Sequence, residues 1–180
     1  MEKEEHAIVL DYLPYGYPLE NKTMPIAQAI GAKNFTLLQL IPRRGVTLQI
    51  NEKVYIGEGK RDKIYYIQGK LNESKLTETA RQQLQEFVAK EIEADEKKII
   101  DFFNKAEAIN TRLHQFELLP GFGKKHTEAI LAERSKRLFE SLEDLKKRVN
   151  NLPDPRKSVE KRFIEEITGK EKYHLFISRQ

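Results

Sequence analysis

The chain has 180 residues, of which 33% are charged and 39% hydrophobic, with a formal net charge of +4, as is typical of a globular protein of one or two domains. Because it lacks cysteine, it can form no disulfide, thiolate metal site or cysteine nucleophile. No apolar run approaches the ~20 residues of a membrane span, and the acidic N-terminus lacks signal-peptide features, so we expect a cytoplasmic protein without a membrane partner.

Short β-rich runs, separated by glycine- and proline-containing turns, occupy the first 70 residues. Five such runs in so short a segment favour a small barrel, because closure removes exposed strand edges. We therefore expect an OB-like β-barrel domain over residues 1–74, with a short helix over residues 25–32. The five expected strands are residues 7–13, 34–41, 46–50, 53–57 and 63–69.

From Thr77 the spacing of apolar residues changes from two to about 3.6, which indicates helices. The apolar stripe of the first helix consists of Ala80, Leu84, Phe87, Val88 and Ile92. Residues 172–178 are expected to form a strand or a docked tail. The sequence thus predicts a two-domain α+β protein, with a helical domain over residues 75–180. Further helices are expected over residues 95–106, 112–119 (capped by Asn110 or Thr111), 124–133, 141–149 and 156–168, with Gly169 ending the last.

Positive charge is concentrated in the last third of the chain. Residues 120–180 contain 15 Lys and Arg against 10 Asp and Glu, whereas residues 71–119 contain 7 against 10. This distribution suits a polyanionic partner. A helical domain with a solvated basic face would have a similar distribution.

The segment "LLPGFGKKHTEAIL" at residues 118–131 contains the most informative turn. Pro120 ends the preceding element, and Gly121 and Gly123 permit unusual backbone angles and close approach to a ligand. Phe122 between them is expected to pack into the core. The helix that begins at Lys124 presents unpaired N–H groups and the positive end of its dipole, which together favour an anion.

Two common phosphate-binding motifs are excluded at this turn. A Walker loop requires glycine and Ser/Thr where the chain has Leu118 and Lys125. A dinucleotide-binding glycine motif would require a third glycine three residues after Gly123, where the chain has His126. A purely structural turn between two helices remains an alternative.

The turn resembles the helix-hairpin-helix motif of DNA repair and recombination proteins over residues 111–134. The matching residues are Leu119, Pro120, Gly121, Phe122, Gly123, Lys124, Ala129 and Ile130. The resemblance implies that Gly121, Phe122, Gly123 and Lys124 hold one backbone phosphate, with Lys125 and Thr127 nearby. Residues 152–157 repeat the pattern weakly, which predicts a degenerate second hairpin over residues 141–168 and an all-α (HhH)2-like domain.

Five segments of the chain resemble those of a known family: "VLDYLPYG", "YIGEGKRDKI", "FFNKAEAINTRLHQFELLPGFGKK", "ILAER" and "FESLEDLKKRV". Through these segments nearly the whole chain resembles the archaeal DUF655 family, in which an OB-like domain precedes a helix-hairpin-helix domain. The resemblance implies an archaeal, cytoplasmic protein of information processing and supplies no activity.

Basic residues also occur at the turns of the expected barrel, near tyrosines. Basic loops and aromatic side chains together can bind single-stranded nucleic acid. Alternatively, the tyrosines fill barrel faces and the cations are solvated. The basic residues are Arg43, Arg44, Lys60, Arg61 and Lys63, and the tyrosines are Tyr15, Tyr17, Tyr55, Tyr65 and Tyr66.

No residue cluster has the spacing of a catalytic or metal site. The four histidines are scattered, and the carboxylates at residues 91–96 have the pattern of a solvated face. We therefore expect a non-enzymatic protein with no cofactor and no metal. Its expected function is sequence-tolerant binding of nucleic acid, RNA or DNA. The alternative is a protein–protein adaptor in archaeal translation, transcription or repair machinery.

Overall fold

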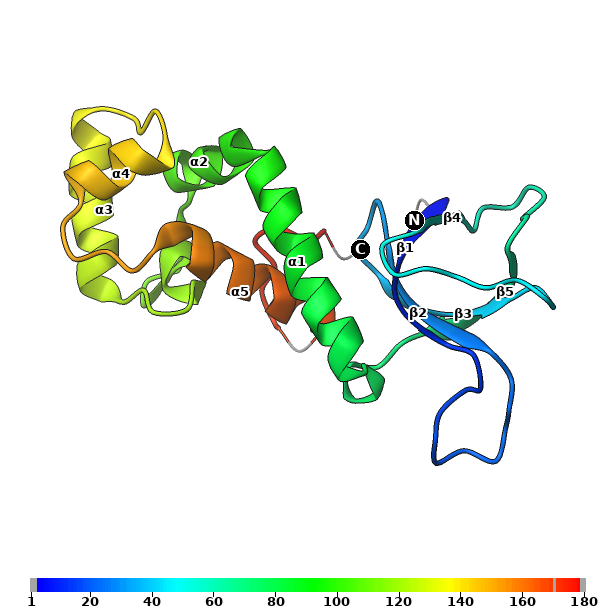
Figure 1. Ribbon diagram of the computed structural model, residues 1–180. Helices are drawn as coiled ribbons and strands as arrows, with labels where there is room; N and C mark the ends of the chain where they lie inside the picture. The colour runs from blue at the N-terminus through cyan, green and yellow to red at the C-terminus, as the bar shows by residue number, and fades with distance from the viewer. Residues whose placement is uncertain (1–2, 170, 179–180) are drawn as a thin grey trace. The chain divides into compact units, whose positions relative to one another are not determined.

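The computed structural model describes residues 3–169 and 171–178, which form two compact units (Figure 1). We call them the sheet unit, which contains the residues up to 86 and those from 166 onwards, and the helical unit, residues 87–165. The division falls inside two helices. The domain limits expected from the sequence, 1–74 and 75–180, stay a prediction.

A curled antiparallel sheet forms the sheet unit. Its strand order is β4-β1-β2-β3-β5, so that β4 and β5 are the edges. Irregularities in register between Val9 and Asp11, and between Gln39 and Leu40, bend the ladders. The core on one face contains Val9, Ala27 and Leu40. The strands are β1 (His6–Leu13), β2 (Ile26–Gly31), β3 (Leu37–Pro42), β4 (Lys53–Tyr55) and β5 (Ile64–Lys70).

The helix expected over residues 25–32 is wrong, because this segment is strand β2. All six of its residues are buried, so the strand lacks the alternation of a half-exposed sheet. Ala27 pairs with Leu40, and Ala29 with Leu38. Alanine has a high helix propensity, but here the small side chains let a central strand pack on both faces.

The strand expected over residues 46–50 is also wrong, because this segment is irregular. Leu48 inserts into the core and is 4% exposed, whereas Ile50 is 42% exposed. The alternation therefore reflects one anchoring side chain rather than a hydrogen-bonded ladder.

The helices after residue 77 follow the sequence pattern closely. Thr77 Oγ1 accepts from the Ala80 amide at 3.0 Å, and Asp95 Oδ1 from the Lys98 amide at 3.2 Å, so both cap helices as N-cap residues do. The expected start at Thr77 and stop at Gly169, where φ is +88°, are confirmed. The helices are α1 (Glu78–Ala94), α2 (Glu96–Lys105), α3 (Lys124–Lys136), α4 (Leu142–Arg148) and α5 (Pro155–Thr168), with a 3₁₀ turn, η1 (Glu73–Lys75), before α1.

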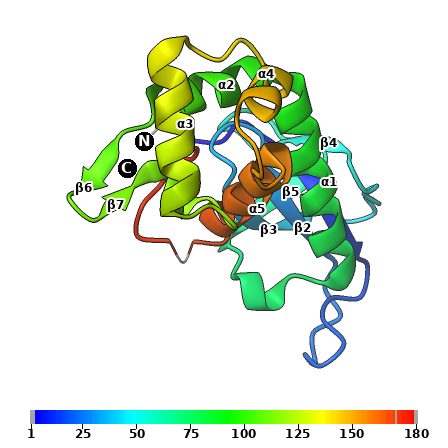
Figure 2. The same cartoon turned by 90° about the vertical axis from the view of Figure 1, so that its left-hand side faces the viewer.

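The helix expected over residues 112–119 is wrong. This segment forms part of a two-stranded hairpin, β6 (Ala108–Asn110) and β7 (Leu113–His114), followed by a 3₁₀ turn, η2 (Gln115–Leu118). Figure 2 shows the hairpin beside α3. Asn110 Oδ1 accepts from the Arg112 amide at 2.8 Å and so holds a turn instead of capping a helix.

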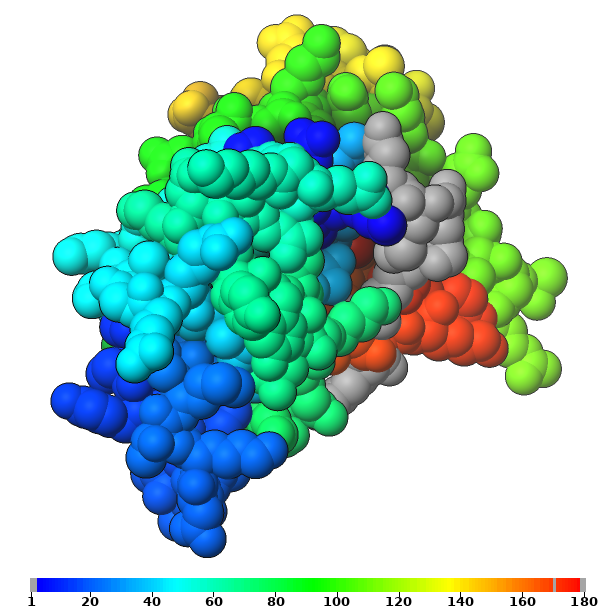
Figure 3. All heavy atoms as spheres, turned by 90° about the vertical axis from the view of Figure 1, so that its right-hand side faces the viewer, coloured from blue at the N-terminus to red at the C-terminus, as the bar shows by residue number. Residues whose placement is uncertain are grey.

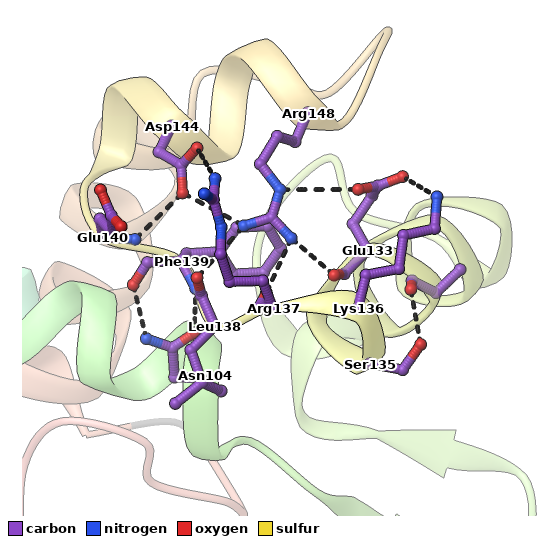
Figure 4. Close-up of polar contacts among 11 residues, drawn as sticks. Asn104, Glu133, Ser135, Lys136, Arg137, Leu138, Phe139, Glu140, Asp144 and Arg148 are labelled. Atoms are coloured by element: carbon purple, nitrogen blue, oxygen red, sulfur yellow. Dashed lines mark hydrogen bonds and ion pairs between the residues drawn. The ribbon is translucent and has the colours of Figure 1, made fainter.

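Arg148 fixes the loop between α3 and α4 (Figure 4). Its guanidinium stacks over the Phe139 ring at 4.6 Å and forms ion pairs with Glu133 and Asp144. Asn104 completes the loop, because its side chain both donates to and accepts from the Phe139 backbone, each at 2.8 Å. The guanidinium donates to three carbonyls, those of Glu133 at 2.6 Å, Arg137 at 2.7 Å and Leu138 at 3.2 Å.

The final segment is a docked tail, one of the two outcomes expected for residues 172–178, and contains no strand. The carboxylate of Glu166, which is fully buried, accepts from the amides of Leu175, Phe176 and Ile177 at 2.6 to 3.0 Å. Three amide donors compensate the burial of this polar group.

Candidate nucleic-acid interface

A tight turn connects η2 to α3, and we call this turn together with the first turn of α3 the α3 hairpin, residues 119–127. The Phe122 amide donates to the Leu119 carbonyl at 3.0 Å, and Gly121 has φ +86°. Proline at the second position and glycine with positive φ at the third are the signature of a type II turn. Gly121 is therefore required by the backbone itself.

Phe122 anchors the α3 hairpin in the core, as expected from the sequence. It is 6% exposed, and its ring centroid lies 6.2 Å from that of Phe103. Phe103 in turn stacks on Phe116 of η2 at 5.5 Å. Ile130 is fully buried, but Ala129 is exposed and does not help to close the hairpin. The aromatic cluster thus fixes the turn at the start of α3.

The N-cap residue of α3 has no side chain to cap the first helical amides, and the first turn of the helix contains no acidic residue. Gly123 is the N-cap residue, and the Thr127 amide makes the first helical bond, to the Gly123 carbonyl at 3.0 Å. The amides of Lys124, Lys125 and His126 precede that bond. Lys124 and Lys125 are exposed at the positive end of the helix dipole, where a cation is unfavourable.

Gly123 differs from Gly121 in what the fold requires of it. Its φ is −122°, a value that any residue adopts, and a side chain built on it would meet no atom within 4 Å. A larger residue would therefore fit there. The open space instead leaves this backbone accessible to a group from outside.

Two neighbouring side chains already bond to Gly123. The Gly123 amide donates to His126 Nδ1 at 3.0 Å, and the buried Thr127 hydroxyl donates to the Gly123 carbonyl at 3.1 Å. The Thr127 hydroxyl thus already has a partner in the first turn of the helix, and its expected place near a phosphate stays a prediction. The role of His126 was missed in the sequence, although a histidine at the third helical position has the reach of a capping side chain.

The second Leu-Pro turn, expected as a degenerate copy, lies against the α3 hairpin. A side chain at Gly121 would approach Pro153 to 3.5 Å, and Ser158 Oγ donates to the Pro120 carbonyl at 2.8 Å. Here, however, Asp154 occupies the N-cap position. Its carboxylate accepts from the Arg156 amide at 3.0 Å and the Lys157 amide at 3.4 Å. The N-terminus of α5 is therefore satisfied internally.

Two of the expected basic residues of the sheet unit are brought together. Arg43 Nε donates to the Arg61 carbonyl at 2.8 Å, and Arg61 Nε donates to the Gly57 carbonyl at 2.7 Å. Lys63 is instead paired with Glu52, and this hydrogen bond holds the pKa of Glu52 below its usual range. Lys63 therefore contributes less uncompensated charge than the arginines. Arg44 and Lys60 are exposed on the neighbouring turns.

The tyrosines divide into engaged and exposed side chains. Tyr17 donates to Gln39 at 2.7 Å, and the Tyr55 hydroxyl accepts from the Gly59 amide at 3.0 Å. By contrast, Tyr15 is 79% exposed, Tyr65 63% and Tyr66 38%. Only the last three have a substantial ring area available for stacking.

The structure adds one buried histidine to the region before the α3 hairpin. His114 Nδ1 accepts from the Phe116 amide at 3.1 Å, and its own amide donates to Glu117 at 2.7 Å, which caps η2. Burial, together with the charge of Arg134, lowers the pKa of His114. Arg134 itself donates to the Ala106 carbonyl at the end of α2 at 2.9 Å.

An open groove of about 1080 Å³ lies in the sheet unit. Its carboxylates include Glu4, which accepts from the Lys33 and Asn34 amides, and Glu58, which pairs with Lys3. These two carboxylates therefore already have partners within the sheet unit. Among residues 3–169 and 171–178 there is no cluster of three or more His, Asp or Glu side chains that could bind a metal ion. No helix within these residues is long and apolar enough to cross a membrane.

Comparison with known proteins shows a match along nearly the whole chain. The chain is 40% identical over 176 residues to an uncharacterised protein of Methanocaldococcus jannaschii, covering 97% of this chain and 80% of the relative. The crystal structure of a DUF655 protein from Archaeoglobus fulgidus is 44% identical, with a TM-score of 0.81 over 97% of this chain and 100% of that one. The model of the family described as protein of unknown function DUF655 matches residues 3–178, and the chain therefore belongs to the DUF655 family.

Proposed function

We propose that the protein binds the sugar–phosphate backbone of nucleic acid, RNA or DNA, at the α3 hairpin, without reading the sequence. The observation that carries this proposal is the start of α3, where a glycine N-cap leaves helix amides uncapped beside two exposed lysines. Amides and cations at a helix N-terminus are suited to a phosphate oxygen. Contacts to phosphate position a protein on nucleic acid but specify no base.

The other α-helices support this interpretation by contrast. Within the described residues, α1, α2, α4 and α5 each begin with a side-chain acceptor, from Thr77, Asp95, Ser141 and Asp154. At α3 a glycine replaces such a cap, which costs roughly a few tenths of a kcal/mol. The chain also places two cations where they oppose the dipole, at a cost of about 0.3–1 kcal/mol each. A bound anion would offset both costs.

The fold supports the same interpretation. We infer that the two Leu-Pro turns form a helix-hairpin-helix pair in which η2 takes the place of a regular first helix. We also infer that the five-stranded sheet is OB-like, a partly open barrel with edges at β4 and β5. Two departures accompany this inference: the connection between β3 and β4, where an OB-fold more often carries its helix, contains none, and β3 pairs antiparallel with β5.

The test substitutes Gly123→Asp, which copies the cap that Asp154 provides in α5. The open space at Gly123 accommodates the new side chain, so the variant is expected to fold at least as stably as the wild type. Its carboxylate would occupy the amides and repel phosphate, while Lys124 and Lys125 remain. Gln85→Glu, at an exposed position of α1, is the control for the change in net charge.

Binding is measured by fluorescence anisotropy with labelled single- and double-stranded RNA and DNA at several salt concentrations. We expect wild type and Gln85→Glu to bind duplexes with a logarithmic salt slope of about −0.9 for each B-DNA phosphate neutralised. Gly123→Asp should lose affinity and have a shallower slope. If the wild type binds none of the four nucleic acids at low salt, the proposal is wrong and the adaptor role becomes the working hypothesis.

A further inference from the structure

A second surface, distinct from the α3 hairpin, lies in the sheet unit where β3 ends and β5 begins. Figure 3 shows the face on which this part of the chain, drawn in cyan to turquoise, reaches the surface. The Arg43 amide donates to the Lys63 carbonyl at 2.8 Å, which ties the turn after β3 to the start of β5. We call Arg43, Arg61, Tyr65 and Tyr66 the β5 surface.

Hydrogen bonds from Nε hold the two arginine side chains of the β5 surface in place. Each guanidinium uses Nε to bond a backbone carbonyl, Arg43 that of Arg61 and Arg61 that of Gly57. Within residues 3–169 and 171–178, neither arginine forms an ion pair with a carboxylate. Their terminal nitrogens thus remain for a ligand on side chains whose freedom is already restricted. Such preorganisation lowers the entropy cost of binding, and the planar fork suits phosphate oxygens.

Two aromatic rings extend the β5 surface along the edge strand. Tyr66 pairs with Ile41 of β3, immediately before the turn that carries Arg43. Tyr65 and Tyr66 contact each other edge to face, with centroids 5.4 Å apart. This contact restricts the motion of the two rings, while Tyr65 remains 63% exposed. An exposed, steadied ring at the edge of a sheet is a platform on which a flat group can stack.

The charges near the β5 surface favour an anionic ligand. Lys63 and Glu52 compensate each other, and Glu58 is paired with Lys3. Asp62 is exposed on the same segment and opposes an anion. Arg44 and Lys60, also exposed, add two cations to the two anchored arginines. The sum at these turns is therefore positive.

We infer that the β5 surface binds an unpaired stretch of nucleic acid, with phosphates on Arg43 and Arg61 and a base stacked on Tyr65. A base inside a duplex has no free face for a tyrosine, whereas an unpaired base does. The inference takes its ligand class from the proposed function but rests on different residues.

The experiment uses the full chain and labelled oligomers of about 12 nucleotides, single-stranded and blunt duplex, within the range of site sizes for small barrels. Tyr65→Ala is compared with Tyr65→Phe, which retains the ring, and with Leu138→Ala, which removes a large exposed side chain of the helical unit. We expect Tyr65→Ala to weaken single-strand binding about 5- to 100-fold and to leave duplex binding unchanged. Tyr65→Phe and Leu138→Ala should stay within about twofold of the wild type.

The outcomes separate this inference from the proposed function. If duplexes bind through Gly123 but single strands do not bind, or if Tyr65→Ala and Leu138→Ala behave alike, the inference about the β5 surface is wrong and the α3 hairpin stands. If single strands bind through Tyr65 and duplexes do not bind, the inference stands and the α3 hairpin is wrong. Tyr65-dependent binding of polyglutamate, but of no oligonucleotide, would overturn the inference in favour of an acidic protein partner.

Discussion

Two glycines of the α3 hairpin, only two residues apart, are expected to respond in opposite ways to alanine. Gly121 has φ +86°, and its added methyl group would lie 3.5 Å from Pro153, an ordinary contact. The cost of Gly121→Ala therefore comes from the backbone angle, about 1–2 kcal/mol. At roughly 2–4 °C per kcal/mol for a chain of this size, the melting temperature should fall by about 2–8 °C.

Gly123→Ala should leave the fold almost unchanged, because φ is −122° and the space around the position is open. Alanine caps a helix slightly less well than glycine, at a cost of about 0.5 kcal/mol. In the proposed complex the added methyl group would crowd a phosphate oxygen that approaches the uncapped amides of Lys124 and Lys125. Losing one charge-assisted hydrogen bond, about 1.5 kcal/mol, would lower duplex affinity about tenfold.

The assay is thermal unfolding of both alanine variants, followed by duplex titration well below either melting temperature. The reasoning predicts a destabilised Gly121→Ala protein, and a stable Gly123→Ala protein that binds weakly. It is refuted if Gly123→Ala unfolds as early as Gly121→Ala, since Gly123 would then be structural. It is equally refuted if Gly123→Ala binds duplexes as well as the wild type.

Three further predictions concern the helical unit. Arg148→Met removes the donors that fix the loop between α3 and α4 and should lower the free energy of unfolding in urea by about 2–3 kcal/mol. Arg112→Met, at an exposed position, should change it by less than about 0.5 kcal/mol, and equal effects of the two substitutions would show that the Arg148 guanidinium is dispensable. Because the pKa of His114 is lowered in the folded protein, the unfolded chain takes up a proton more readily, and the free energy of unfolding should decrease from about pH 6.5 down to that lowered pKa. His114→Asn keeps a capping acceptor, so its free energy of unfolding, measured in urea between pH 7.5 and 5.5, should decrease less steeply. Identical slopes would contradict this assignment. Because His126 occupies the Gly123 amide, His126→Ala should raise duplex affinity about two- to tenfold in anisotropy titrations, whereas a lower affinity would mean that His126 itself contacts the phosphate.

The sequence predicted most of the helices because their capping residues and apolar spacing agree. Ile99, Ile100 and Phe103 of α2 lie on one buried face, as their spacing indicates. The errors occurred where tertiary packing outweighs local preference. Ala27 and Ala29 belong to a helix-forming composition, yet the sheet needs small residues in a central strand.

The helix predicted for the segment before the α3 hairpin, residues 112–119, was wrong for a different reason. Asn110 is equally suited to a helix cap and to a turn, and the sequence does not show which backbone amide it will bond. The structure resolves this in favour of the turn, with the Arg112 amide as donor. His114 then starts η2 through Nδ1. Neither histidine contact, at His114 or His126, has a spacing signal strong enough to be predicted.

The candidate site was predictable in position but not in its internal bonds. Gly121, Phe122 and Gly123 were all expected to form the turn, but each does something different in the structure. Gly121 adopts the positive φ that the turn needs, Phe122 packs into the core, and Gly123 leaves the space beside the backbone open. The basic turns were less predictable. Sequence proximity grouped Lys63 with Arg61, whereas the ion pair with Glu52 sets Lys63 apart.

The two Leu-Pro turns provide the strongest argument about function, because they differ in how the helix that follows each of them begins. In α5 the N-cap is Asp154, which satisfies two amides, so the helix start is complete. In α3 the N-cap is Gly123, and the helix start is completed only by the side chain of His126 at one amide. The fold does not require a glycine at the start of α3, because Gly123 has an ordinary φ of −122° and open space around it. A requirement outside the fold, such as a bound phosphate, accounts for the glycine better than stability does.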